Sequence, residues 1–387
     1  MRKTTASRSG RLVLMTSHCA GMVDMVALPL WVGTLVTAYT FDAQQAGGLV
    51  TLFLLGAVGA SIFFAPRFNR IDGRRAAVAG FTVAALCFFA AAQTRQFEWL
   101  AALHLAGGIA AGTGLSFTHG TIGRSANPHR LFGMAGMALG VFAVILLGAA
   151  PQFMARLGAQ ALFQALGIAM AVAAALAAWA FPVADEETQA SRTFRESGQR
   201  MPARVWFGIF GVGLMALVQA MVYSFVERMG ADRGFGLAAV TGILVAIGIV
   251  NIFPSGAAAL LERRIGAGLV LRAGPVLQGA LALVIAMSAT LAPFAVAASV
   301  FVAVMLFTHT FAFGELARRE ITGRVVAATP AMVMIGSAIG PVLGGTLAKL
   351  SGYTAIGVAA VLIDLLALVC FVQLTRGASA REGVVAA

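Results

Sequence analysis

Long apolar runs separated by short polar segments fill this chain from residue 12 to residue 374. The runs are continuously apolar and rich in Ala and Leu, whereas the strands of a membrane β-barrel alternate in polarity. A helix needs about 20 mostly apolar residues to cross a bilayer. Dividing the runs at charged and turn-forming residues predicts twelve membrane spans, numbered in order: 12–36, 46–65, 76–93, 97–120, 131–153, 161–181, 205–226, 237–261, 269–288, 294–316, 327–348 and 352–374.

The composition excludes a soluble domain. Of the 387 residues, 60% are hydrophobic and only 11% are charged. A soluble protein carries roughly a quarter charged residues, because its surface has to be covered by polar groups. The chain is therefore predicted to be an all-α integral membrane protein.

The basic residues predict how the spans are oriented. With the N-terminus in the cytoplasm, 22 of the 27 Lys and Arg residues fall in cytoplasmic segments. Such a bias places both termini inside the cell, and the chain is expected in the inner (cytoplasmic) membrane as a multi-pass protein. It also accounts for the net charge of +12, since basic loops face anionic lipid. The lipid bilayer is thus the expected partner, and no nucleic acid is needed.

The longest polar stretch, 183–203, separates six spans from six spans. We expect an N-terminal half over 1–182, a cytoplasmic linker over 183–203 and a C-terminal half over 204–387. A shift of 193 residues, half of the length, aligns three separated pairs of similar residues: Arg11 with Arg204, Gly73 with Gly266, and Arg156 with Lys349. Two duplicated, parallel six-span halves are typical of one large class of transporters.

The loop between spans 2 and 3 ends in Asp72-Gly73-Arg74-Arg75. It resembles the signature Gly-x-Leu-Ala-Asp-Arg-x-Gly-Arg-Arg of the major facilitator superfamily, and this resemblance extends over essentially the whole chain. In that family the loop helps to hold one conformation through its Asp. Here Arg70 takes the place of that Asp, and Asp72 is the candidate substitute. The resemblance implies that Asp72, Arg74 and Arg75 take part in conformational gating.

A second motif lies in span 11, where Gly336, Gly340, Pro341, Gly344 and Gly345 match a Gly-x-x-x-Gly-Pro-x-x-Gly-Gly pattern. Antiporters of this family often carry that pattern in span 5, the repeat partner of span 11. Small residues let helices approach closely, and a proline weakens the helix backbone. We expect a gating hinge, in which Gly340→Leu blocks turnover more than folding; the alternative is ordinary close packing.

Polar residues at membrane depth are costly, so each needs a role. In the resembling family, spans 1, 4, 7 and 10 line the central cavity. Asp24 lies in the middle of span 1, on the same helical face as Ser17 and Trp31. We expect Asp24 to be a proton carrier, since burial away from any fixed cation favours the protonated acid. His104, at the position of a family Arg in span 4, is the second expected proton-coupling group.

Further polar residues are expected to bind the substrate. Ser116 belongs to a small-residue stripe in span 4, for which glycine-mediated helix packing is the alternative. Span 7 repeats polar residues every four positions, and Glu227, at the end of that row, is expected at the outer surface beside Arg228. The expected substrate-binding residues are Ser17, Trp31, Ser116, Gln219, Tyr223, Asn251 and His309. Asp364 in span 12 has no evident role.

The centre of every predicted span lacks Lys and Arg. This favours neutral, cationic or amphiphilic substrates over organic anions, which usually need a fixed cation. The sequence thus predicts a monomeric, proton-coupled carrier of a small organic compound, with efflux favoured over proton symport of a metabolite. It has no nucleotide-binding loop, metal-ligand spacing or nucleophile motif, so no cofactor, metal or enzymatic activity is expected. A sensor on a transporter scaffold is a remote alternative.

Overall fold

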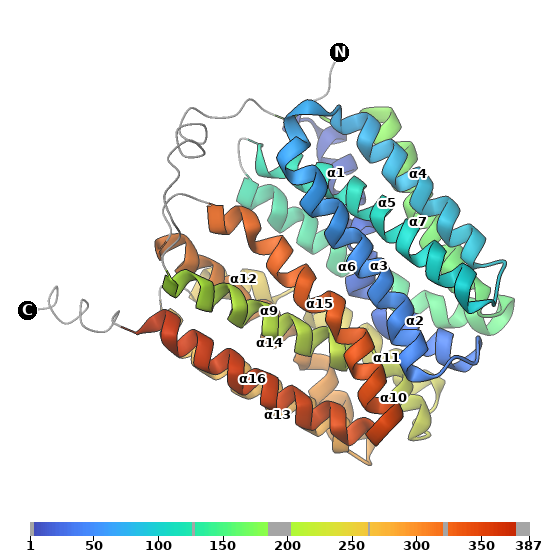
Figure 1. Ribbon diagram of the computed structural model, residues 1–387, viewed down its shortest axis with the longest axis vertical. Coiled ribbons are helices and arrows are strands. Elements are labelled where there is room, and N and C mark those ends of the chain that lie inside the picture. The colour runs from blue at the N-terminus through green and yellow to red at the C-terminus, as the bar shows by residue number, and fades with distance from the viewer. Residues whose placement is uncertain (1–3, 126–127, 185–202, 262–263, 320–323, 377–387) are drawn as a thin grey trace, which may run out of the picture.

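The computed structural model describes residues 4–125, 128–184, 203–261, 264–319 and 324–376, and this part of the chain is a bundle of helices (Figure 1). Its β-structure is limited to an isolated bridge between Thr4 and Val183. The helices are α1 (Arg8–Gly21), α2 (Val23–Thr37), α3 (Ala43–Phe64), the 3-10 helix η1 (Ala65–Arg70), α4 (Gly73–Ala91), α5 (Phe97–Gly123), α6 (Pro128–Leu157), α7 (Gln160–Ala180), α9 (Ala203–Tyr223), α10 (Val226–Asp232), α11 (Leu237–Val250), α12 (Pro254–Leu261), α13 (Ala267–Met287), α14 (Leu291–Arg319), α15 (Arg324–Ser351) and α16 (Tyr353–Thr375).

The all-α membrane architecture predicted from the sequence is confirmed. Within the described ranges, 11 helical segments are long and apolar enough to cross a membrane, and α11 is a shorter apolar helix of 14 residues. Helices α11 and α12 together occupy the predicted eighth span, so the structure is consistent with twelve spans.

Three of the predicted spans are broken, although the hydropathy pattern suggested continuous helices. Span 1 breaks at Met22, whose backbone leaves the helical region (φ −105, ψ 21). Span 7 breaks between α9 and α10, where Phe225 caps the second piece. Span 8 breaks at residues 251–253, before Pro254. Proline explains this last break, because its ring disfavours a helical conformation in the residue before it.

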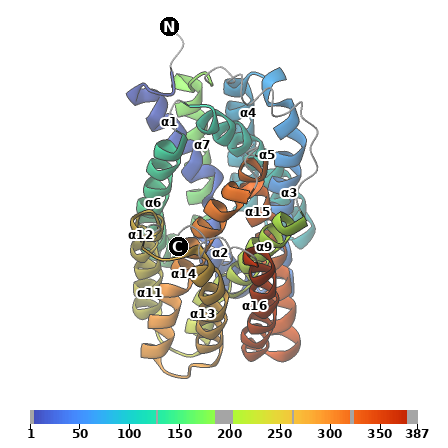
Figure 2. The ribbon, with the colours of Figure 1, turned by 90° about the vertical axis from the view of Figure 1, so that its left-hand side faces the viewer.

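The helices form two groups that lie beside each other (Figures 1 and 2). We call α1–α7 the first half and α9–α16 the second half. Within the first half, α3 packs on α5 and α4 packs on both α5 and α7. Within the second half, α15 and α16 pack on α9, and α13 packs on α16. The main contacts between the halves join α3 to α15 and α6 to α11. Most of the predicted linker, residues 185–202, lies outside the described residues.

The bundle has two ends. We call the end that carries residues 4–8, η1 and residue 376 the terminal face. The far face is the opposite end, where α2 meets α3 and where α15 meets α16. The sequence predicts that the terminal face is cytoplasmic, and this orientation remains a prediction.

Candidate functional site

Asp24 lies directly after the break in span 1, in the first turn of α2. Its side chain is buried, with 5% of its surface exposed. The polar groups that its carboxyl meets are the backbone amides of Asp24 itself and of Met25. These amides belong to the first turn of a helix, where the helix dipole favours an acidic side chain. The break in span 1 thus gives a carboxyl group at membrane depth a local polar partner.

Two predicted substrate-binding residues of α9 lie on the second-half side of this break. The hydroxyl of Tyr223 donates a hydrogen bond of 3.2 Å to the backbone carbonyl of Val26, two residues beyond Asp24. One turn away, Gln219 is also buried, and its Oε1 has no hydrogen-bond partner among the described residues. Asp24, Tyr223 and Gln219 therefore bring polar groups from both halves to the junction of α2 and α9.

Glu227 continues the same row one turn beyond Tyr223, but it does not lie where the sequence suggested. We expected it at the outer surface beside Arg228. Instead, Oε2 of Glu227 is buried against Gly33 of α2. Arg228 pairs with Asp232 at 2.6 Å. The break between α9 and α10 explains the difference, because it changes the direction in which the residues of α10 point.

Glycines bring α3 and α15 into backbone contact near the far face. A Cβ atom on Gly345 would overlap the carbonyl oxygen of Ala43, and one on Gly47 would overlap that of Pro341. The backbone amide of Val342 also donates to Thr51 Oγ1 at 3.2 Å. Since no larger side chain fits at either glycine, the two halves are closed on each other here.

An ion pair covers this contact. Lys349 Nζ, near the end of α15, lies 2.9 Å from Oδ2 of Asp42, which precedes α3. Partial burial opposes the ionisation of Asp42. However, hydrogen bonds from Lys349 and from the backbone of Gln45 and Gln44, together with the Lys349 charge, hold the pKa of Asp42 below its usual value.

Removing this ion pair should weaken the closure of the far face modestly. Both side chains are partly exposed, so we expect Asp42→Asn to cost about 0.2–1 kcal/mol of closed state. A lowered pKa means that the pair stabilises closure above the ordinary pKa of Asp, and that this support is lost as the pH falls through the lowered value. A spin-label distance across the far face should therefore show an Asp42 contribution that stays constant between about pH 5 and about pH 9. A contribution that disappears within this range would contradict the assignment.

The remaining glycines of the span 11 motif face α9 of the same half. Gly336 contacts the carbonyl of Gly213, and a Cβ on Gly340 would lie 2.6 Å from the amide nitrogen of Met221. A Cβ on Gly344 would lie 2.8 Å from the Met221 carbonyl oxygen. The motif therefore has two packing surfaces, one inside the second half and one between the halves.

The gating loop predicted between spans 2 and 3 has a clear local structure. Asp72 is the N-cap of α4, and its Oδ1 accepts a hydrogen bond of 2.8 Å from the backbone amide of Arg75. Arg74 donates to the carbonyl of Ala178 in α7. Asp72 thus caps α4, and the gating role of Asp72, Arg74 and Arg75 remains a prediction.

His104 and Trp31 belong to one aromatic cluster inside the first half. Trp31 Nε1 donates to His104 Nε2 at 3.0 Å, and His104 Nδ1 donates to the Leu100 carbonyl at 2.7 Å. Phe163 packs edge-on against both rings. Both ring nitrogens of His104 are used, which describes a neutral imidazole, and Trp31 is fully buried.

Replacing Trp31 should reveal how much this hydrogen bond contributes. Trp31→Phe leaves His104 Nε2 without its donor inside the core, which costs about 1–3 kcal/mol of stability. We expect a lower thermal unfolding temperature for the detergent-solubilised protein. The matched control is Trp99→Phe, because Trp99 is 63% exposed. This control variant should unfold at the same temperature as the wild type. Equal unfolding temperatures for both variants would contradict the importance of this bond.

The other predicted substrate-binding residues each have their own local setting. Ser116 lies 3.1 Å from Ser61 of α3, so it faces another helix of its own half. His309 Nδ1 donates to the Met305 carbonyl at 3.0 Å. Ser17 Oγ and Asn251 Oδ1 are buried without hydrogen-bond partners among the described residues. The hydrogen bonds of Ser116 and His309 therefore stay within their own halves, and the substrate-binding role of all four residues remains a prediction.

The structure also reveals a histidine pair that sequence reasoning missed. His18 Nδ1 of α1 and His119 Nε2 of α5 lie 2.9 Å apart. The two residues are 101 positions apart, so no local spacing signals the pair. Asp364 has a different setting, with both carboxyl oxygens buried and without hydrogen-bond partners among the described residues, against Gly279 of α13.

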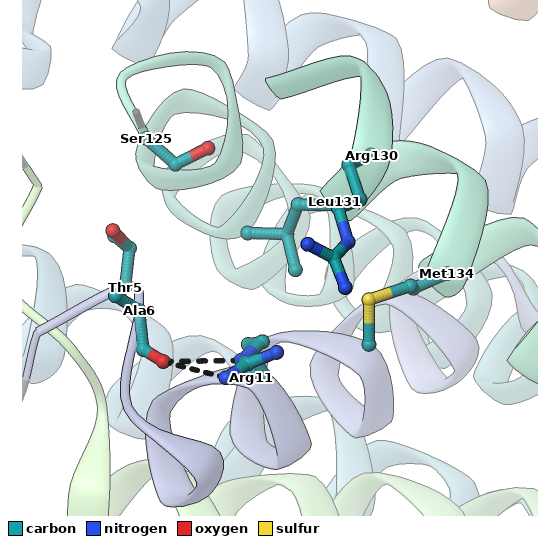
Figure 3. A pocket seen from close by; sticks show the side chains of 7 residues that line it. All are labelled: Thr5, Ala6, Arg11, Ser125, Arg130, Leu131 and Met134. Carbon is teal, nitrogen blue, oxygen red and sulfur yellow. Dashed lines mark hydrogen bonds between the residues drawn. The ribbon is translucent and has the colours of Figure 1, made fainter. Parts of the chain in front are cut away.

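A pocket of about 160 Å³ lies at the terminal face of the first half (Figure 3). Arg11 stands at its edge and donates through Nε and Nη2 to the carbonyl of Ala6, at 3.1 and 2.8 Å. Arg130 and Met134 reach into the same space from α6 (Figure 3). The pocket places basic groups at the terminal end of the bundle and is distinct from the junction of α2 and α9. Within the described ranges, no group of three or more His, Cys, Asp or Glu residues could hold a metal ion.

Comparisons with known proteins agree with this architecture. No curated protein matches the chain. The nucleoside transporter NupG has a similar structure, with a TM-score of 0.71 and 13% identity over 95% of this chain and 98% of that one. A bacterial homologue of the human lysosomal transporter Spinster, solved in an inward-facing and unoccupied conformation, has a TM-score of 0.69 and 14% identity over 95% of this chain and 97% of that one. The family model of the Major Facilitator Superfamily matches residues 13–317. The chain is therefore a multi-pass membrane transporter of the major facilitator superfamily.

Proposed function

We propose that this transporter carries a small organic compound by alternating access and is driven by protons, with export in exchange for protons as the favoured direction. The observation that carries the proposal is a set of contacts that joins the two halves. Glycine contacts, the Tyr223 hydrogen bond and the Lys349–Asp42 ion pair gather toward the far face. A carrier closed at one end must separate these contacts to release or admit its substrate there.

The junction of α2 and α9 is our proposed substrate region. It offers hydrogen-bonding groups from both halves, at Gln219 and Tyr223, and one carboxyl group, at Asp24. The middle of each described span lacks Lys and Arg. These features support a neutral or cationic substrate, because a buried anion would need a compensating cation. They also support exchange, since a proton and a cationic substrate can compete for one carboxylate.

Transport by purified protein in proteoliposomes tests this proposal. The substrate panel should contain cationic amphiphiles, neutral compounds including nucleosides, and organic acids; nucleosides are included because NupG is a nucleoside transporter. An imposed proton gradient should drive at least one compound against its own concentration gradient. Movement opposite to the protons identifies exchange, and movement with the protons identifies symport. Gradient-independent flux of every transported compound would exclude proton coupling.

A further inference from the structure

Glu227 occupies an unusual place between the two halves. It belongs to the first turn of α10 in the second half. Its Oε2 fills the space beside Gly33 of α2, where any larger side chain would overlap it. This oxygen is buried and has no hydrogen-bond partner among the described residues. The carboxyl group of one half therefore lies directly on the backbone of the other, on the side where the halves are closed.

The charges around Glu227 leave its carboxyl without a bound cation. On its own helix, Arg228 pairs with Asp232 through Nη2 at 2.6 Å and Nε at 3.0 Å. Asp232 also accepts a hydrogen bond of 2.6 Å from the Tyr353 hydroxyl of α16. Helices α2 and α11 pack on α10. Helix α11 has no titratable residue, and Asp24 is the only titratable residue of α2. Asp24 lies in the first turn of α2, far along that helix from Gly33.

We propose that Glu227 is a proton-binding site that must be occupied for the far face to close. An ionised carboxylate that is buried without a partner is strongly unfavourable, whereas the neutral acid can be buried at a much smaller cost. When the halves separate at α2 and α10, the same carboxyl becomes hydrated and exchanges its proton with the far-face solution. The Glu227 carboxyl binds one proton each time the far face closes. It releases that proton to the far-face solution after the face has opened. This inference relies on the alternating access of the proposed function.

A proton linked to closure makes the conformational equilibrium depend on pH. Wherever the closed state holds one proton more than the open state, the ratio of open to closed protein rises up to tenfold per pH unit. The far face should therefore open as the pH rises and close as it falls. The Lys349–Asp42 pair cannot produce this response between about pH 5 and about pH 9, because Asp42 stays ionised there with a lowered pKa.

The test is a distance measurement on the full-length protein in lipid nanodiscs. Cys19, Cys87 and Cys370 are replaced by Ser, and spin labels are attached at exposed far-face positions, Gln96→Cys and Leu350→Cys. In the labelled protein that retains Glu227, the distance between the labels should change from short to long as the pH rises from about 5 to about 9. Glu227→Gln, which keeps the size but cannot ionise, should stay short at every pH. Glu227→Asp, which still titrates, should retain a pH response.

The neighbouring glycine provides an independent variant. Gly33→Ala places a methyl group where the Glu227 carboxyl lies. The flexible Glu227 side chain then has to leave this buried place, so the pH response of the distance should be weakened. The proposal is overturned if Glu227→Gln keeps the pH response of its parent. If Glu227→Gln does not fold, the proposal is overturned when Gly33→Ala keeps the pH response of its parent. The distance measurement needs no substrate. An absence of proton-driven flux would therefore reject the proposed function, while the distances would still test the role of Glu227.

Discussion

A leucine at Gly345 or at Gly47 should abolish transport while both halves remain folded. Each glycine lies against the backbone of the opposite half, where a Cβ atom would overlap a carbonyl oxygen. Because backbone atoms cannot move aside as a flexible side chain can, the larger residue has to hold α3 and α15 apart. The carrier should then remain open at its far face, and substrate flux in proteoliposomes should fall to the level of protein-free vesicles.

Two neighbouring glycines serve as controls for this steric argument. Gly48 has no atoms within 4 Å of an added Cβ, so Gly48→Leu should transport as wild type does. The sequence predicted that Gly340→Leu would affect turnover more than folding. Because Gly340 packs on α9 within its own half, we now expect this variant to lower the unfolding temperature as well. Normal flux in Gly345→Leu and Gly47→Leu would show that this contact is not part of the transport cycle.

Asp24→Asn should remove proton-driven net transport and leave substrate binding in place. Asparagine retains the size of Asp24 and can still accept from the backbone amides at the start of α2, so the break in span 1 should persist. It cannot bind and release a proton, so gradient-driven flux should fall to background and its pH dependence should be lost. Flux is measured with and without a proton gradient, and binding is measured by thermal shift over about pH 5 to about pH 9.

Asp364→Asn is the matched control, because Asp364 is also a buried carboxyl but contacts Gly279 within the second half. It should leave the proton dependence of transport unchanged. Wild-type gradient-driven flux in Asp24→Asn would remove Asp24 from the coupling mechanism. Loss of folding in Asp24→Asn would instead assign Asp24 a structural role at the helix break.

The sequence predicted the membrane architecture well because hydropathy depends only on local composition. Broken spans were harder to predict. Pro254 could have revealed the break in span 8, since proline disfavours helical continuation. The break at Met22 follows Gly21, a weaker signal than proline because glycine is common within membrane helices.

The candidate site was harder to predict because helical spacing does not reveal which neighbour a face meets. Ser116 and the glycines beside it form a regular stripe, and the structure packs Gly108 and Gly112 onto the backbone of α3. His104 reads as a lone ionisable group, yet it accepts a hydrogen bond from Trp31. The side chain of Glu227 points elsewhere than the helical spacing suggests, because a helix break precedes α10. Such pairings depend on contacts between distant segments, as does the His18–His119 pair.

The most direct test of alternating access is to measure distances at both faces of the same protein. One label pair spans the far face at Gln96→Cys and Leu350→Cys, and a second pair spans the terminal face at Asn69→Cys and Arg264→Cys, all at exposed positions. We predict two populations whose distances change in opposite senses, so that substrate or pH lengthens one pair as it shortens the other. Distances that stay constant at both faces, under conditions in which the protein transports, would contradict the account.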